Sequence, residues 1–218
     1  MAPRTAEIIA VGSELLGSTR PDTNSLYLSG RLAAIGVDLR IKSVVGDERG
    51  DLAAVFRQAL DRADLIVLTG GLGPTDDDLT REVVAEVLGL PMDVDESIVA
   101  QIRARFDKRG LVMPEANRRQ GQVPRGATVL DNPNGTAPGL MIDHAGPRGR
   151  GLVILLPGPP RELEPMFDRV CAGPLRARAG SERAHTTALF ITGRGESHVE
   201  QLVPVSYTHL TLPTICSV

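Results

Sequence analysis

Short apolar runs alternate with helix-like patterns through the first half of the chain, and this alternation constrains the fold more than any other feature. Buried strands are expected at residues 7–11, 37–45 and 65–68, and helices at 23–34, 51–63 and 82–88. Strands that alternate with helices are typical of βαβ units. The sequence therefore predicts an α/β fold, a doubly wound, mostly parallel sheet with helices on both faces.

The first expected helix illustrates the local signals. Apolar side chains at Leu26, Leu28, Leu32 and Ala33 have helical spacing, with a cap at Asp22 or Thr23. Gly36 follows as a terminator. The run at 65–68 is apolar without interruption, as in a strand covered on both faces.

The second half departs from simple alternation. Residues 93–120 combine a helical apolar stripe with many arginines, and we interpret them as a helical insertion near the site. A hairpin-like pair follows at 128–130 and 139–142. A buried strand at 152–156 and a helix from 161 to about 176 complete the pattern.

Three regions are expected along the chain. Residues 1–178 form the α/β domain, and residues 185–204 form the start of a truncated second domain. Residues 205–218 have no charged side chain and differ abruptly in composition, so we interpret them as a non-native tail. A native polar tail is the alternative.

Composition excludes several classes of function. A net charge of −3 and 3% aromatic residues provide neither a basic footprint nor stacking surfaces for nucleic acid. No segment has the ~18–20 consecutive apolar residues of a membrane span, and no signal peptide is evident, so we expect a cytoplasmic protein. Two cysteines and four scattered histidines argue against a zinc centre or Cys-His catalysis.

The glycine-rich segment 70–78, Gly-Gly-Leu-Gly-Pro-Thr-Asp-Asp-Asp, is the candidate site. It follows a predicted parallel strand, where doubly wound proteins bind ligands. Gly70, Gly71 and Gly73 would let the backbone approach phosphate oxygens closely. The segment has neither the Gly-Lys-Ser/Thr of a P-loop nor Gly-x-Gly-x-x-Gly, so neither an ATPase nor a nicotinamide dehydrogenase follows.

Asp76, Asp77 and Asp78 would lie beside bound phosphates, whose negative charge would repel these carboxylates unless something compensated for it. Mg²⁺ or a similar divalent metal held by these carboxylates would do so, since Mg²⁺ is commonly held by one or two carboxylates plus phosphate oxygens. The alternative is that they cap the next helix, because Thr75-x-x-Asp78 resembles a capping box. We favour the metal.

Other loops are expected at the same edge of the sheet. As catalytic candidates we take Asp77, Asp78, Glu14 and Asp22, with Glu14 or Asp22 as the general base and Asp77 or Asp78 as metal ligand. Arg161 is a candidate anion clamp. The expected phosphate-binding or substrate-binding residues are Gly70, Gly71, Gly73, Thr75, Ser13, Asn24, Asn134, Gly135, Thr136, Gly158 and Arg161.

Five motifs together resemble the CinA family, the competence/damage-inducible proteins. They are Gly-Ser-Glu-Leu-Leu-Gly (12–17), Asp-Thr-Asn (22–24), Gly-Gly-Leu-Gly-Pro-Thr-Asp-Asp-Asp-Leu-Thr (70–80), Asn-Pro-Asn-Gly-Thr-Ala-Pro-Gly (132–139) and Leu-Pro-Gly-Pro-Pro-Arg-Glu-Leu (156–163). The resemblance covers about residues 5–178. It implies the three-layer molybdopterin-binding fold of the MoaB and Mog proteins, with Asp22 and Asp78 at that fold's acidic positions.

The resemblance also implies a function. CinA domains of this type are associated with metal-dependent ADP-ribose pyrophosphatase activity, a hydrolase reaction, whereas NMN deamidase activity belongs to a separate C-terminal domain that we expect to be absent here. Residues 186–203 look like the start of the family's middle domain. Related domains commonly self-associate, so a homo-oligomer is expected.

Three hypotheses follow. The first is a metal-dependent nucleotide diphosphate hydrolase that acts on ADP-ribose-like substrates. The second is a non-catalytic module that binds a molybdopterin or a nucleotide. The third, a regulatory scaffold in competence or DNA damage, rests on the family name alone.

Overall fold

The computed structural model describes residues 3, 5–146, 149–178 and 193. Its contacts divide the chain into one unit at 1–184 and another at 185–218. Of the second unit only Gly193 is described. The expected second domain and the tail at 205–218 therefore lie outside the described residues, and both interpretations stay predictions.

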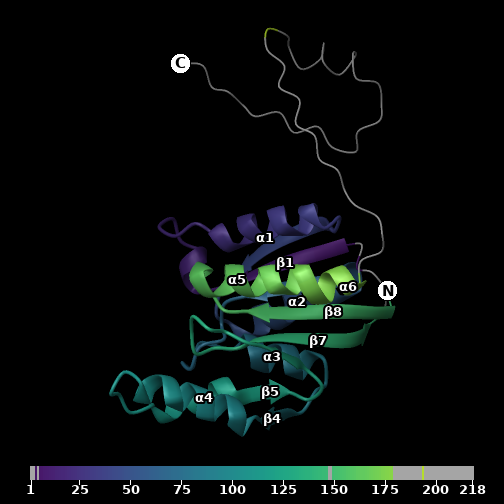
Figure 1. The fold of residues 1–218 in the computed structure, drawn as a ribbon. Helices are drawn as coiled ribbons and strands as arrows, with labels where there is room; N and C mark the ends of the chain where they lie inside the picture. Colours follow the sequence, from purple (N-terminus) through teal and green to yellow (C-terminus); the bar gives the residue numbers. More distant parts are fainter. Residues whose placement is uncertain (1–2, 4, 147–148, 179–192, 194–218) are drawn as a thin grey trace. The chain divides into compact units, whose positions relative to one another are not determined.

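A six-stranded sheet forms the centre of the first unit, in the order β2-β1-β3-β8-β7-β6 (Figure 1). Strands β1 (Thr5–Val11), β2 (Asp38–Val45), β3 (Leu65–Thr69) and β8 (Gly149–Leu156) are parallel. Strand β7 (Gly139–Gly146) is antiparallel to both of its neighbours, β8 and β6 (Thr128–Leu130). The predicted α/β class, doubly wound and mostly parallel, is confirmed.

Helices cover both faces of this sheet because successive strand residues point to opposite sides. In β1, Ile8 packs with α1 (Thr23–Ala34) and α5 (Pro160–Val170). The next residue, Ile9, packs with α2 (Arg49–Arg62) and α3 (Thr80–Val87). Both side chains are fully buried, so the sheet separates two apolar layers.

The expected apolar face of α1 is partly wrong. Leu28 and Leu32 are fully buried, but Leu26 is 71% exposed. The reason is helical geometry, since two residues advance the chain by ~200° around the axis and place Leu26 opposite Leu28. Of the two expected cap residues, Asp22 is the N-cap and accepts a hydrogen bond from Ser25 N–H, whereas Thr23 is the first residue of the helix.

The insertion is more than helical. Between α3 and β6 the chain forms β4 (Met92–Val94), α4 (Glu96–Asp107), the 3-10 helix Glu115–Gly121 and β5 (Gln122–Pro124). Strands β4 and β5 pair in a separate two-stranded antiparallel sheet, which the sequence did not predict. Figure 1 shows this insertion at the bottom of the view, beyond α3.

The predicted helix 161–176 is interrupted. It consists of α5, a π-helical turn at Cys171–Leu175 that contains Pro174, and a short α6 (Arg176–Arg178). Proline lacks the backbone N–H that a continuous α-helix needs. Among the described helices, none is long and apolar enough to cross a bilayer.

Candidate functional site

A pocket of about 460 Å³ lies at the carboxyl ends of the parallel strands. The segments after β1, β2, β3 and β8 all contribute to its lining. From β1 the chain crosses to β2 on one side and then returns to β3 on the other side. The pocket therefore occupies the topological switch point, where doubly wound folds bind ligands.

The glycine-rich loop after β3 forms one wall of this pocket. Gly70 and Gly71 have positive φ angles of 92° and 64°. A Cβ atom on Gly70 would clash with the carbonyl oxygen of Val11, and one on Gly71 would clash with Thr80 Oγ1. The sequence interpretation that these glycines make room for phosphate is therefore incomplete, because the protein itself fills the space beside them.

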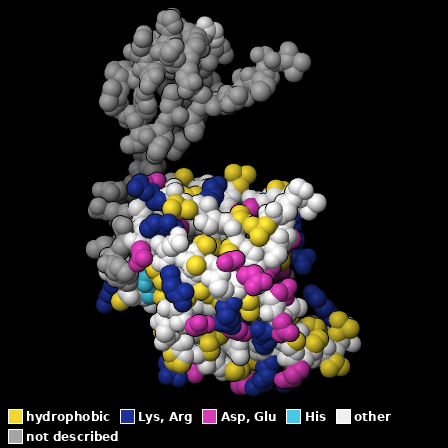
Figure 2. Space-filling view, turned by 180° about the vertical axis from the view of Figure 1, so that it is seen from behind, with side chains coloured by type: hydrophobic (Ala, Val, Ile, Leu, Met, Phe, Trp, Pro, Cys, Tyr) yellow, Lys and Arg dark blue, Asp and Glu magenta, His cyan; other side chains and the backbone are white. Residues whose placement is uncertain are grey.

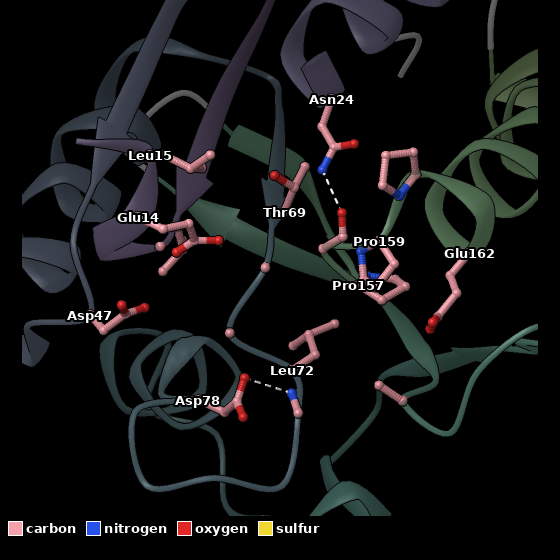
Figure 3. Close-up of a pocket in the computed structure, with 18 of the residues that line it drawn as sticks. Glu14, Leu15, Asn24, Asp47, Thr69, Leu72, Asp78, Pro157, Pro159 and Glu162 are labelled. Atoms are coloured by element: carbon pink, nitrogen blue, oxygen red, sulfur yellow. Dashed lines mark hydrogen bonds between the residues drawn. The ribbon is translucent and has the colours of Figure 1, made fainter. Parts of the chain in front are cut away.

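Asp78 holds this loop closed. Its Oδ1 accepts a hydrogen bond from Gly73 N–H at 2.8 Å, and its Oδ2 accepts bonds from the N–H and the hydroxyl of Thr75. Figure 3 shows Asp78 beside the loop, with its bond to Gly73. Helix α3 begins at Thr80 after Leu79, without a side-chain cap. Asp78 thus makes the back-bond to Thr75 N–H that a capping box predicts, but this bond closes the loop before α3 and does not cap the helix itself.

A buried arginine lies behind the loop. Arg81 is 1% exposed and donates hydrogen bonds to the carbonyl oxygens of Leu72 (2.8 Å) and Arg119 (3.1 Å). Burial lowers the pKa of Arg81 to about 10, so the guanidinium remains protonated at neutral pH. Sequence reasoning missed this residue, since it stands in a predicted helix start without any local sign of burial.

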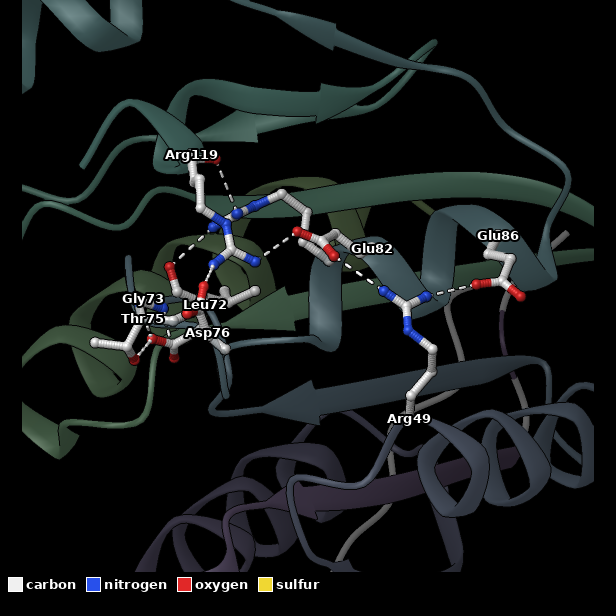
Figure 4. A network of polar contacts seen from close by, with 10 residues as sticks. Arg49, Leu72, Gly73, Thr75, Asp76, Glu82, Glu86 and Arg119 are labelled. Atoms are coloured by element: carbon white, nitrogen blue, oxygen red, sulfur yellow. Dashed lines mark hydrogen bonds and ion pairs between the residues drawn. The ribbon is translucent and has the colours of Figure 1, made fainter. Parts of the chain in front are cut away.

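Asp76 lies outside the lining of the pocket. It is fully exposed and pairs with Arg119 at 3.0 Å. Arg119 also pairs with Glu82 at 2.8 Å, and Arg49 then links Glu82 to Glu86 (Figure 4). The ion pair with Glu82 raises the pKa of Arg119. Asp76 therefore belongs to a surface network that joins the loop to the insertion and to α2.

Asp77 is the carboxylate of the three that lines the pocket without closing the loop. It is exposed, and hydrogen bonding from Thr75 holds the pKa of Asp77 below its usual range. A lowered pKa keeps this carboxylate ionised at neutral pH. The structure thus gives the three consecutive aspartates three different environments.

Three further carboxylates face the same pocket from other strands. Glu14, after β1, lies 3.5 Å from Arg20, and Asp22 uses one oxygen to cap α1. Asp47, after β2, accepts a hydrogen bond from Ser13 N–H, while Ser13 Oγ accepts one from Asp47 N–H. Glu14 and Asp47 lie on one side of the open centre in Figure 3. Asp47 was missed because nothing near it in sequence marks it as a site residue.

Asn24 joins two of the contributing loops. Its side-chain amide donates a 2.7 Å hydrogen bond to the carbonyl oxygen of Gly158 (Figure 3). Its Oδ1 is buried and has no hydrogen-bond partner among the described residues. An unpaired buried acceptor is costly, so this oxygen is available to a donor on a ligand or a water.

The structure divides the predicted site residues into two groups. Those that line the pocket are Glu14, Asp22, Asn24, Gly70, Gly71, Gly73, Asp77, Asp78, Thr136 and Gly158. Those outside its lining are Ser13, Thr75, Asp76, Asn134, Gly135 and Arg161. Of the second group, Ser13 and Thr75 hold lining residues in position.

Asn134, Gly135 and Arg161 lie at a neighbouring cavity instead. Glu162, which the sequence analysis did not select, borders both cavities. It is 8% exposed and accepts a hydrogen bond from Asn132 at 2.8 Å. A Cβ atom on Gly135 would clash with its carboxylate, which explains why glycine stands there.

The carboxylates fit a metal site that the protein shares with a bound ligand better than a site formed by protein side chains alone. Within the described part of the chain, no group of three or more His, Cys, Asp or Glu side chains lies close enough together to hold a metal ion. The oxygen donors of the lining suit hard cations such as Mg²⁺, which commonly takes only one or two protein carboxylates and completes its shell with phosphate oxygens and water. Asp77 has the chemistry for such a partial site.

Comparison with known proteins gives a consistent result. The family model described as "Probable molybdopterin binding domain" matches residues 7–177. A "Putative competence-damage inducible protein" of Symbiobacterium thermophilum is 53% identical over 194 residues, which cover 88% of this chain and 45% of the relative. A "CinA-like protein" of Koribacter versatilis is 45% identical over 203 residues, covering 93% and 49%. The chain spans about half the length of the curated relatives it matches.

Solved structures show the same fold. The protein CinA from Thermoplasma acidophilum, described as of unknown function, has 33% identity and a TM-score of 0.67, covering 76% of this chain and 96% of that one. The tungsten cofactor synthesizing protein MoaB from Pyrococcus furiosus has a TM-score of 0.52 over 79% of this chain and 93% of that one. Its 16% identity supports similarity of fold alone.

Proposed function

Because this chain belongs to the CinA family and contains its molybdopterin-binding-like domain, we propose that the pocket is the active site of a metal-dependent hydrolase for ADP-ribose-like nucleotide diphosphates. The observation that carries the proposal is the charge of the lining. Six carboxylates line the pocket with one arginine, Arg20, and the carboxylates are Glu14, Asp22, Asp47, Asp77, Asp78 and Glu162. A diphosphate would be repelled there unless a cation neutralised it.

A divalent cation shared between Asp77 and the diphosphate would neutralise charge on the phosphate oxygens. Asp77 is the best ligand because it is exposed to the pocket and ionised, whereas both oxygens of Asp78 accept hydrogen bonds within the loop. In this assignment Asp78 positions the loop, and Asp76 has no role in binding.

The loop backbone supplies part of the ligand contact. Gly70 N–H donates to the Leu156 carbonyl at 3.0 Å, and Gly73 N–H donates to Asp78. These two groups hold the fold together. The N–H groups of Gly71 and Leu72 are therefore the ones we assign to phosphate oxygens, with buried Arg81 behind them contributing positive potential.

Glu14 is the stronger candidate for the general base. Asp22 commits one oxygen to the cap of α1, whereas Glu14 makes only a half-exposed contact with Arg20. Glu14 would accept a proton from a water molecule while the oxygen of that water attacks phosphorus. The bridging P–O bond would break, and ADP-ribose would yield AMP and ribose 5-phosphate.

The test is incubation of the chain with ADP-ribose, other nucleotide diphosphates and NMN, with Mg²⁺, Mn²⁺ or EDTA, followed by chromatography of the products. We expect AMP and ribose 5-phosphate from ADP-ribose only when a divalent metal is present. Turnover that persists in EDTA would remove the metal from the proposal. NMN is expected to remain intact.

A non-catalytic binding module is the second candidate. It is favoured by the loop itself, since Asp78 and two of the glycine N–H groups are occupied by structural hydrogen bonds. In that case ADP-ribose or a pterin phosphate would bind in the presence of metal without any product. Equilibrium binding measured beside the chromatography separates the two functions.

Three expectations remain proposals, namely self-association, a cytoplasmic location and a small-molecule ligand rather than nucleic acid. Self-association can be checked by light scattering, and a cytoplasmic location by fractionation. For nucleic acid, Figure 2 shows blue and magenta side chains intermixed over the visible face of the described residues, without a continuous basic stripe. This mixture favours a small-molecule ligand over a polyanion.

A further inference from the structure

A second cavity of about 170 Å³ adjoins the pocket and has the opposite charge. Thr136 and Glu162 line both cavities, so the two are neighbours. Arg105, Arg109 and Arg161 also line the smaller one, and Glu162 is the only carboxylate in its lining. The acidic pocket and the arginine cavity therefore meet at a shared wall.

Arg105 has a structural task in this cavity. Its guanidinium donates hydrogen bonds to the carbonyl oxygens of Asn132 (2.7 Å) and Gly135. These bonds attach α4 to the loop between β6 and β7, and they place a positive charge in the wall without neutralising it. Substitution of Arg105 would disturb the loop, so it is unsuitable as a test.

Arg109 and Arg161 are free to bind an anion. The guanidinium of Arg109 has no hydrogen bond or ion pair with any described residue, and that of Arg161 makes one long ion pair, of 4.0 Å, with Glu162. The side chain of Arg161 is 80% exposed. Arg109, which has no described partner, and Arg161, which has only this long and exposed contact, form a site for a phosphate beside Arg105, because a guanidinium can donate two parallel hydrogen bonds to phosphate oxygens.

The size of the cavity limits the occupant. A cavity of about 170 Å³ has room for a phosphate group rather than for a whole nucleotide. We propose that the arginine cavity is a phosphomonoester subsite that binds without a metal, beside the metal-dependent pocket. Its occupant would be ribose 5-phosphate, an assignment that rests on the proposed function.

The test is calorimetric titration of the chain with ribose 5-phosphate in EDTA. We expect the parent chain to bind ribose 5-phosphate. In the Arg109→Ala/Arg161→Ala double variant the affinity should fall by a factor of about ten or more. Arg103→Ala is the control for each single substitution, because it removes one positive charge from the exposed surface of α4 outside the cavity. Ribose without phosphate should not bind.

The outcomes separate this inference from the proposed function. Hydrolysis of ADP-ribose without binding of ribose 5-phosphate in EDTA would overturn the subsite and leave the hydrolase intact. Arginine-dependent binding without hydrolysis would support the subsite and remove the hydrolase. Equal loss of affinity in Arg103→Ala would also overturn the inference, since a general charge effect would then explain it. If the double variant unfolds, the single variants Arg109→Gln and Arg161→Gln provide the same comparison.

Discussion

The carboxylate of Asp78 accepts a 2.8 Å hydrogen bond from the backbone N–H of Gly73, and it occupies the space that a side chain at Gly73 would need. This pair closes the loop that follows β3. A position that requires glycine and a carboxylate that requires backbone donors therefore depend on each other. The mutual dependence makes both residues testable.

Gly73→Ala should open the loop. The new Cβ would clash with the carboxylate of Asp78, so we expect a loss of about 1–3 kcal/mol in the free energy of unfolding and a loss of ligand binding. Gly30→Ala is the control, because no atom lies within 4 Å of a Cβ at that helical position. Denaturant titration should show Gly30→Ala neutral or stabilised. Equal destabilisation of both variants would contradict the assignment.

Asp78→Asn should lose both stability and function. The aspartate accepts bonds from two backbone N–H groups on two different oxygens, whereas asparagine has one acceptor oxygen, so one donor would lose its partner. We expect a cost of about 1–3 kcal/mol. A variant with unchanged melting temperature and no activity would instead make Asp78 a direct ligand.

Asp77→Asn should reduce metal-dependent turnover with an unchanged melting temperature. Asp77 is exposed and lines the pocket, so its removal affects the ligand rather than the fold. The neighbouring Asp76→Asn removes an equal charge from the network with Arg119 and should retain turnover within about twofold, as expected for an exposed ion pair. Metal titrations of both variants would decide. Equal effects would show that net charge alone matters.

His144 should make stability depend on pH. Burial lowers the pKa of His144, although Asp143 opposes the shift, and neither ring nitrogen has a described hydrogen-bond partner. The unfolded chain therefore takes up this proton first as the pH falls below ~6.5, and the free energy of unfolding should decrease from there down through the lower pKa of the folded state. His144→Gln should flatten this part of the curve. Denaturation at pH 7.5, 6.5 and 5.5 provides the measurement, and identical slopes for both proteins would exclude the effect.

The amino-acid sequence by itself determined the order of strands and helices in the first half of the chain and the place of the glycine-rich loop, although not the β4–β5 pair of the insertion. These features follow from periodicities of two and 3.6 residues and from glycine and proline signals, which depend on close neighbours along the chain. The continuous apolar run in β3 and the cap at Asp22 are examples. The local pattern was ambiguous at Leu26, where spacing alone did not reveal which leucines face the sheet.

Only the tertiary structure decided what each charged residue of the site does. Asp76, Asp77 and Asp78 are three consecutive residues of the same type. Asp76 pairs with Arg119, 43 positions away, whereas Asp77 lines the pocket and Asp78 closes the loop. Arg81 is buried because the loop and the insertion fold over it. Hydrogen bonds and burial arise between segments distant in the chain, so local patterns carry no information about which oxygen or guanidinium remains free for a ligand.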